Sequence, residues 1–194
     1  MLTKKEILRK TIHLSSVLLI FFDYYIDHEI TIYSLFFVIV IYSISEFLRV
    51  NKKIRVPLIS DVTEYCSYSF EKRIFVYSPL VFATSILVLL IFFNKTQAYV
   101  GIVALGLGDG VAGLIGKKYG KKKIFYNKKK SWEGFLSMFF VIFLGSILLI
   151  QDVFISFIIS LVTPFIESLS NEAIDNLTVP FSAVAIIRLI KKFL

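Results

Sequence analysis

The sequence predicts an all-helical protein, a polytopic transmembrane helical bundle formed by a single integral membrane domain over residues 1–194. Hydrophobic residues make up 57% of the chain and the mean hydropathy is +0.78, an apolar excess that the polar residues of a soluble domain could not cover. Long stretches carry no charged residue, and the basic residues gather between those stretches. Both patterns are typical of helices that cross a bilayer.

The charge-free stretches give the number of expected membrane segments. A bilayer core of ~30 Å is crossed by about 20 apolar residues of helix. Four segments have this length, namely residues 29–48 (with Glu46 near one end), 74–94, 96–116 (with Asp109 as its single charged residue) and 134–151. Three shorter segments, residues 11–22, 153–166 and 176–187, also fit re-entrant or interfacial positions. We therefore expect about seven membrane segments and leave open whether the last two cross fully.

The distribution of basic residues predicts the orientation of the chain. Three basic regions are residues 4–10, 49–55 and 117–130, with Lys72 and Arg73 following the second. Two predicted helices separate each region from the next, so all three lie on one side, and positive charge marks the cytosolic side. If the last two segments both cross, Lys191 and Lys192 lie on the opposite side. We expect localisation in the cell membrane, or in the endoplasmic reticulum of a eukaryotic host.

Charge and cysteine content exclude several classes of function. The net charge is +8, but because the basic residues lie between membrane segments, it predicts contact with anionic lipid or nucleotide and no nucleic acid partner. Cys66 is the only cysteine, which excludes an intramolecular disulfide and a cysteine-based zinc site. Residues 56–73 are predicted to form an interfacial loop or a short amphipathic helix.

The stretch GLGDGVAGLIGKKYGKKK, residues 106–123, places one carboxylate among small residues. A charged residue inside a membrane segment is costly, so Asp109 is a candidate functional residue. Gly108 and Gly110 would let a ligand or a neighbouring helix approach the backbone closely. The candidate phosphate ligands that follow are Lys117, Lys118 and Lys121. Mg²⁺ uses one or two carboxylates plus substrate phosphates, so the pattern suits a nucleotide triphosphate; helix packing and membrane anchoring are the alternative.

A second stretch, KKKSWEGF at residues 128–135, joins the lysines to a charge-free span. Lys130 is a further candidate phosphate ligand. Ser131 could cap the next helix while Glu133 complements the helix dipole. A helix N-terminus of this kind also presents free N–H groups to phosphate, so the structural and the functional interpretations are compatible.

A third stretch, ESLSNEAIDNLTVP at residues 167–180, is acidic. Glu167, Glu172 and Asp175 are candidates for a second metal ligand or a catalytic base. Asn176 follows directly. The alternative is a polar turn between two membrane segments.

Two further polar residues lie near the predicted cytosolic ends of helices. His13 is an aromatic base, and most single histidines at such a position are interfacial. Glu46 is spaced for a simple i,i+3 pair with Arg49. Both are candidates with these simpler alternatives.

Taken together, these stretches resemble the dolichol kinase/phytol kinase family of CTP-dependent lipid kinases. The shared features are Gly108–Asp109 in a Gly/Ala-rich helix, the basic loop 117–130, the KSWEG segment at 130–134, the acidic stretch from Glu167 through Asp175-Asn176 to Pro180, and the RKxxH opening at residues 9–13. The resemblance covers most of the chain, and the order and spacing of the motifs are more specific than any one of them.

The Gly-Asp and Lys-x-x-Glu-Gly motifs also resemble the phosphatidate cytidylyltransferases. Those enzymes continue to a Lys-Asp and a His-Gly-Gly-x-x-Asp-Arg signature near the C-terminus. The chain has no such signature, since its only histidines are His13 and His28. This absence, with Asp175-Asn176 in its place, favours the kinase.

The resemblance implies transfer of the γ-phosphate of CTP to the hydroxyl of a membrane lipid alcohol at the cytosolic face. The lipid partner would be a polyprenol or dolichol, a phytol-like isoprenoid alcohol or diacylglycerol. We expect Asp109 and Asp175 to bind Mg²⁺, and Lys117, Lys130 and their neighbours to hold phosphates. Glu133 and Asn176 would complete the site, while Glu167 and Asp175 compete for the role of general base.

Two alternatives stay open. One is a cytidylyltransferase-like CDP-lipid synthase, which would release pyrophosphate where a kinase releases CDP. The other is a non-enzymatic transporter or membrane scaffold, because glycine-broken helices with an intramembrane carboxylate also occur in transporters. The lysine-rich loop favours an enzyme. The sequence leaves the oligomeric state open, a homo-oligomer included.

Overall fold

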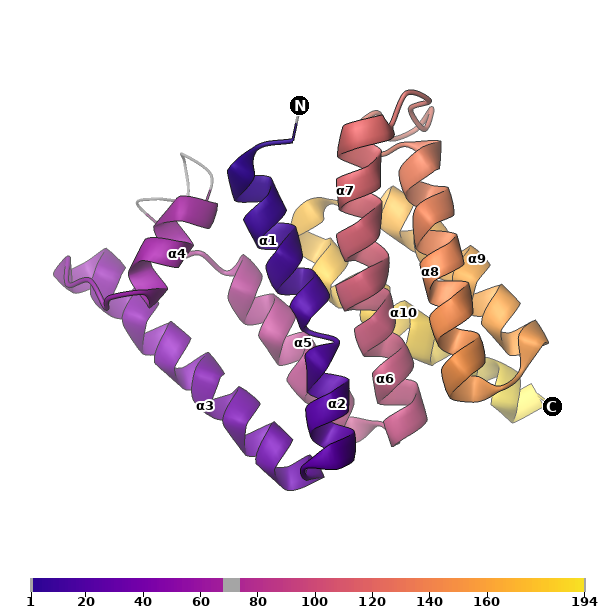
Figure 1. Ribbon diagram of the computed structural model, residues 1–194, viewed down its shortest axis with the longest axis horizontal. Coiled ribbons are helices and arrows are strands. Elements are labelled where there is room, and N and C mark those ends of the chain that lie inside the picture. The colour runs from indigo at the N-terminus through magenta and orange to yellow at the C-terminus, as the bar shows by residue number, and fades with distance from the viewer. Residues whose placement is uncertain (1, 68–73, 194) are drawn as a thin grey trace.

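The structure is a computed structural model that describes residues 2–67 and 74–193, and it consists of helices packed side by side (Figure 1). The elements are α1 (Lys4–Ser15), α2 (Leu18–Tyr25), α3 (His28–Phe47), η1 (Leu48–Lys52), α4 (Ile59–Cys66), α5 (Ser78–Phe92), α6 (Lys95–Val103), η3 (Ala104–Asp109), α7 (Gly110–Tyr119), α8 (Trp132–Ile150), α9 (Val153–Leu169) and α10 (Glu172–Phe193). Within the described ranges no strand is present beyond one isolated bridge between Lys123 and Ser131. The predicted all-helical class is confirmed.

Three helical stretches in the described part of the chain are long and apolar enough to cross a membrane, namely His28–Lys52, Lys95–Tyr119 and Trp132–Ile150. They match three of the four long predicted segments. The helices α5 and α9 are apolar but have only 15 and 17 residues. The predicted first segment contains the break between α1 and α2, and α10 carries charged residues near both ends. Seven membrane segments are therefore not confirmed, and that count stays a prediction.

The long segment without a match is residues 74–94, where α5 (Ser78–Phe92) is shorter than predicted because the first residues are held outside the helix. The Glu46 carboxylate accepts a hydrogen bond from Val76 N–H (2.7 Å), and the Tyr42 hydroxyl donates to the Val76 carbonyl (2.8 Å). Arg49 donates to the carbonyl of Ile74 (2.8 Å) and forms a buried ion pair with Glu46. The predicted i,i+3 pair is thus present, and it ties the end of α3 to the approach to α5.

Two of the three predicted basic regions, residues 4–10 and 117–130, lie at the same end of the molecule. Figure 1 shows the N-terminus and the α7–α8 connection on the upper side of the view, with α4 further down at the left. The α2–α3, α5–α6 and α8–α9 connections and the C-terminus lie on the lower side, so α9 and α10 run in opposite directions and Lys191 and Lys192 are far from the other basic regions. Lys72 and Arg73 lie outside the described residues. That the upper side faces the cytosol stays a prediction.

The stretch Lys95–Tyr119, made of α6, η3 and α7, is the most buried of the three candidate spans. Within its apolar window 72% of the residues are buried, against 22% in each of the other two. Small residues allow the close contacts: a Cβ at Gly101 would lie 2.8 Å from the nearest methyl group of Leu89 on α5 and 3.3 Å from Val184 on α10. A helix that is apolar on all sides belongs in the interior. This position carries Asp109 into the interior, at the end of the π-helical turn η3, a geometry often found at functional sites.

Candidate active site

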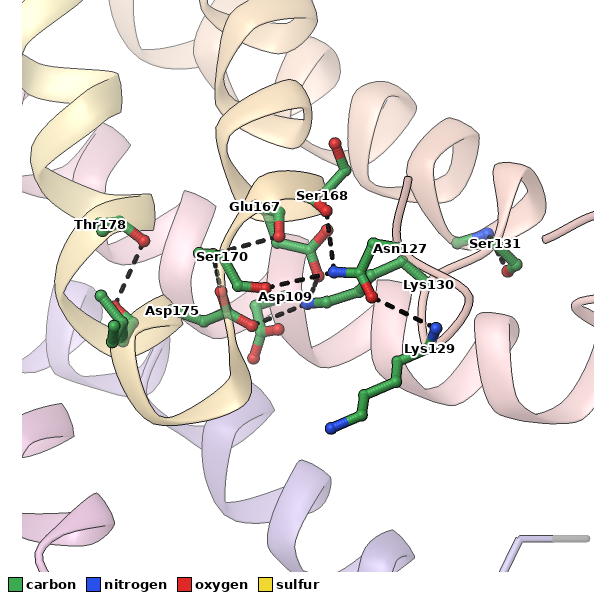
Figure 2. Close-up of polar contacts among 12 residues, drawn as sticks. Asp109, Asn127, Lys129, Lys130, Ser131, Glu167, Ser168, Ser170, Asp175 and Thr178 are labelled. Carbon is green, nitrogen blue, oxygen red and sulfur yellow. Dashed lines mark hydrogen bonds and ion pairs between the residues drawn. The ribbon is translucent and has the colours of Figure 1, made fainter. Parts of the chain in front are cut away.

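Three acidic side chains from three helical elements converge beside the α7–α8 connection. They are Asp109 at the end of η3, Glu167 in the last turn of α9 and Asp175 near the start of α10, and together they are called the acidic cluster. One carboxylate oxygen of each lies within 4.8 Å of one from each of the others, and all three residues are buried. Figure 2 shows the three side chains pointing toward one another. Buried like charges need positive partners, and lysines supply them.

Lys130 is the first of these partners. Its ammonium donates to Asp175 Oδ2 (2.7 Å) and to Glu167 Oε1, so one lysine joins α9 and α10 (Figure 2). Burial opposes the charged form of Lys130, but the two carboxylates outweigh it and raise its pKa well above the usual range. The lysine therefore stays charged at neutral pH, and a residue predicted to hold phosphate is part of the acidic site itself.

The loop between α7 and α8 is fixed by side chains at both of its ends. The Glu133 carboxylate accepts hydrogen bonds from the backbone N–H groups of Lys121 and Lys122 (both 3.0 Å). Ser131 caps α8 by accepting from the Gly134 N–H (3.2 Å), so the capping interpretation of this residue is correct. Glu133 organises the loop that carries Lys130; whether it also contacts substrate stays a prediction.

The same loop is anchored on the turn between α9 and α10. Asn127 donates through its amide to the Ser168 carbonyl (3.0 Å), and the hydroxyls of Tyr126 and Ser168 form a hydrogen bond (2.6 Å). Ser170, in that turn, donates from its hydroxyl to Asp175 Oδ1. Sequence reasoning missed these four residues, because a polar residue in a loop carries no signal of the distant turn that it will contact.

Asp109 has its own positive partner, which comes from the first helix. The Lys10 ammonium lies 2.7 Å from Asp109 Oδ2 and 3.3 Å from the Asp109 main-chain carbonyl oxygen. His13 Nδ1 lies 3.3 Å from the same carboxylate oxygen without a well-aligned hydrogen bond. Lys10 was not predicted as a site residue, although the RKxxH spacing places Lys10 and His13 on one helical face.

The two glycines beside Asp109 lie at helix contacts. A Cβ at Gly108 would lie 3.1 Å from Ile142 of α8, and a Cβ at Gly110 would lie 2.9 Å from Leu14 of α1. These contacts support the helix-packing interpretation of both glycines. Nucleotide binding at Gly108 and Gly110 stays a prediction.

The other predicted phosphate ligands lie along the outer part of α7 and the loop. Lys117 pairs with Glu6 of α1 (2.9 Å), and the Lys118 ammonium lies 4.9 Å from the centre of the Tyr119 ring. The backbone of Lys121 contacts Glu133, as described, and its side chain is exposed. None of the contacts described for these three lysines joins them to the acidic cluster. Their role toward phosphate stays a prediction.

Asn176 follows Asp175 directly but faces another helix. Its amide donates to the carbonyl (3.2 Å) and the hydroxyl (3.3 Å) of Ser78 at the start of α5. Successive residues of a helix point about 100° apart, which separates the two neighbours. Asn176 therefore connects α10 to α5, and its catalytic role stays a prediction. The side chain of Glu172 lies outside the described part of the chain.

The donor set of the acidic cluster fits Mg²⁺. This ion prefers oxygen ligands at ~2.1 Å in an octahedron, so two of its ligands lie about 3 to 4.2 Å apart. The spacing of the three carboxylates, within 4.8 Å, needs only small side-chain movements to meet that geometry. Asp109 and Asp175, predicted as metal ligands, and Glu167, predicted as a base or second ligand, would hold the ion together. The ammonium groups of Lys130 and Lys10 contact these same carboxylates, so a bound ion and the two lysines would neutralise the same negative charges.

Comparison with known proteins gives the family. Phytol kinase 1, chloroplastic, of Arabidopsis thaliana is 30% identical over 125 residues, which are 55% of this chain and 41% of that protein. The phytol kinase of Synechocystis sp. is 32% identical over 98 residues, 46% of this chain and 42% of that one. An uncharacterized protein of Methanocaldococcus jannaschii is 32% identical over 188 residues, 94% of this chain and 93% of that protein. The chain belongs to the dolichol kinase/phytol kinase family.

Membership of the dolichol kinase/phytol kinase family confirms the resemblance read from the motifs. The chain spans less than half of the two phytol kinases, 41% and 42% of their lengths, but nearly the whole of the archaeal relative. No family model matches the chain, and no solved structure is detectably similar to it.

Proposed function

We propose that this protein is a Mg²⁺-dependent kinase that transfers the γ-phosphate of CTP to the hydroxyl of a membrane lipid alcohol at the cytosolic face. The observation that carries the proposal is the meeting of the acidic cluster with Lys130 at the end of the molecule where the basic regions gather. The names of the relatives give phytol as the alcohol that those proteins phosphorylate, which supports an isoprenoid alcohol here.

The proposed reaction is a displacement at phosphorus. The lipid hydroxyl oxygen forms a bond to the γ-phosphorus, the bond from that phosphorus to the oxygen of the β-phosphate breaks, and CDP leaves. The hydroxyl proton passes to a carboxylate, for which Glu167 and Asp175 are the candidates. Such transfers depend mostly on positioning and charge neutralisation, and Mg²⁺, when bound, neutralises charge on the phosphate oxygens. Lys130 and the exposed lysines of its loop would hold the phosphates.

The membrane setting suits a substrate with an apolar tail. The outer surface of the helices is rich in exposed apolar side chains, among them Phe36 and Phe37 on α3 and Leu144 and Leu148 on α8. Exposed apolar surface of this extent is compatible with lipid contact and is unfavourable in water. The tail would lie among these helices while its hydroxyl reaches the acidic cluster at their end.

The test uses purified protein in detergent with Mg²⁺ and CTP labelled in the γ or the α position. The acceptors are polyprenol, geranylgeraniol, phytol, diacylglycerol and phosphatidate. We expect label from the γ position in the lipid and release of CDP. Label from the α position with release of pyrophosphate would replace the kinase by a cytidylyltransferase. Transfer of neither label would overturn CTP as the donor. Other nucleoside triphosphates would then be tested as donors, and failure of these as well would favour a transporter or scaffold.

The substitution Asp109→Asn tests the site itself. We expect turnover to fall by about 10²–10³-fold, the loss usual when one preorganised group that stabilises charge is removed, while the protein still inserts and folds. The control is Asp27→Asn, because Asp27 caps α3 through a hydrogen bond from Ile30 N–H (3.0 Å) and asparagine caps helices equally well. Full turnover by the Asp109 variant would remove this residue from the mechanism.

A further inference from the structure

The Lys10 side chain reaches Asp109 across the surface of α7. Its ammonium contacts both the carboxylate and the main-chain carbonyl of Asp109, although the two residues lie on α1 and η3, 99 positions apart in the chain. The side chain of Lys10 is only 13% exposed, so the contact is largely shielded from water. Shielding of this kind makes the ion pair stronger than one on an open surface.

Gly113 leaves room for the Lys10 side chain because it has no Cβ. Gly113 lies one helical turn beyond Asp109 on α7, and a Cβ at position 113 would lie 2.9 Å from Lys10 Nζ, 3.3 Å from Cδ and closer still to Cε. Real Cβ atoms essentially never approach other atoms within 3.0 Å, so any other residue at 113 displaces the end of the lysine. The displaced atoms belong to a flexible side chain, so the helices themselves need not move.

The neighbouring glycines have a different role. A Cβ at Gly106 would meet the Ser16 hydroxyl and the backbone carbonyl of His13 (3.0 Å), and a Cβ at Gly110 would meet the side chain of Leu14 (2.9 Å). Both therefore leave room for residues at and just after the end of α1, packed against η3 and α7. At Gly113 the three nearest atoms all belong to the Lys10 side chain. In this stretch Gly106, Gly108 and Gly110 thus serve contacts between helical elements, whereas Gly113 leaves room for one lysine.

We propose that Lys10 and Gly113 form a positioning pair, in which Gly113 leaves room for Lys10 to hold the Asp109 carboxylate toward Glu167 and Asp175. This inference rests on the proposed function, because it assigns a purpose to the orientation of Asp109 as a metal ligand. Lys10 acts through Asp109 and is a positioning residue. Partners that orient a metal-ligating carboxylate typically change metal affinity or activity by about 10–100-fold when they are lost.

The test is a double-mutant cycle with Gly113→Ala, Lys10→Ala and both together, with two measurements on purified protein in detergent. One is the dissociation constant of Mn²⁺, followed by the electron paramagnetic resonance signal of the free ion; the other is the midpoint of thermal unfolding. We expect Gly113→Ala to weaken Mn²⁺ binding by about 10-fold or more and to lower the unfolding midpoint no further than Lys10→Ala does, since both variants lose the same ion pair and alanine favours a helix over glycine. In the Lys10→Ala background the same change should have no further effect, because the side chain that it displaces is gone.

The outcomes separate this inference from the proposed function. Wild-type protein that binds no Mn²⁺ and transfers no phosphate would overturn the proposed function, and the positioning pair with it. Wild-type protein that binds Mn²⁺ as tightly as both single variants would overturn the positioning pair alone. Additive effects in the double variant would also overturn it, since Gly113 would then act independently of Lys10. A lower unfolding midpoint on adding Gly113→Ala in the Lys10→Ala background, where the ion pair is already lost, would show that the glycine serves helix contact.

Discussion

Replacing Lys130 by methionine removes one positive charge from the acidic cluster and keeps a side chain of similar length. In the structure the ammonium is shared between Glu167 and Asp175, and the side chain of Lys130 is 15% exposed. The variant therefore leaves two buried carboxylates without their common partner. We expect it to be less stable in the absence of divalent cations and to recover stability when Mg²⁺ is added.

The size of the loss follows from the burial of the pair. Removal of one partner from a buried ion pair typically costs about 3–5 kcal/mol. For a chain of this size each kcal/mol shifts the unfolding midpoint by about 2–4 °C, so the expected fall is about 6–20 °C. A ligand at a hundred times its dissociation constant returns about 2.7 kcal/mol, which corresponds to a rise of about 5–11 °C with saturating Mg²⁺. The wild-type protein should gain less from Mg²⁺, because Lys130 already neutralises the same carboxylates.

The assay is thermal unfolding in detergent, in a chelator and in a series of Mg²⁺ concentrations, for wild type, Lys130→Met and Lys129→Met. Lys129 is the matched control because it is exposed and adjacent in the same loop. An unchanged midpoint for Lys130→Met in chelator would refute the assignment of stability to this ion pair. A lowered midpoint that Mg²⁺ does not restore would refute the acidic cluster as a site for a divalent cation.

Two further predictions concern polar contacts outside the acidic cluster. Asp23→Asn removes the carboxylate that accepts from Tyr99 OH (2.5 Å) and contacts His28 Nδ1 (2.6 Å), so we expect a loss of about 1–3 kcal/mol of stability in thermal unfolding. Mn²⁺ affinity should be unchanged because this contact joins α2, α3 and α6 through residues outside the acidic cluster, and a weaker affinity would contradict that separation. Asn127→Ala should free the α7–α8 loop at a cost of about 1 kcal/mol and raise the KM for CTP. The fluorescence of Trp132, the only tryptophan, should become easier to quench, and unaltered quenching would show that Asn127 does not hold the loop.

Local features of the site could be predicted because they depend on residues close in sequence. Ser131 caps α8 through Gly134, three residues away, and Glu46 pairs with Arg49 at the same spacing. Asp109 was recognisable because placing a carboxylate in an apolar segment costs free energy, so such residues are usually kept for a function. The predicted number of membrane segments was not confirmed, and the segment predicted at residues 74–94 is shorter because side chains of α3 hold Val76 outside the helix that follows.

Which candidate residues meet could not be predicted from spacing along the chain. Asp175 and Asn176 are adjacent in sequence, yet one enters the acidic cluster and the other contacts Ser78 on α5. Lys130 lies in a row of similar lysines, and only the anchoring of its loop on the α9–α10 turn selects it as the partner of the carboxylates. Helix packing and loop anchoring make these choices, and neither has a periodic signature in the sequence.

The sequence by itself determined the all-helical class and the apolar helices suited to a membrane, and its candidate residues included the three carboxylates that meet in the acidic cluster. Hydrophobic runs, charge distribution and the cost of a buried charge act locally, so they can be read from the chain. Only the tertiary structure decided that Lys130 and Lys10 neutralise those carboxylates and that Gly113 leaves room for Lys10. The physical reason is that these contacts join residues 45 and 99 positions apart, which only the packing of the helices brings together.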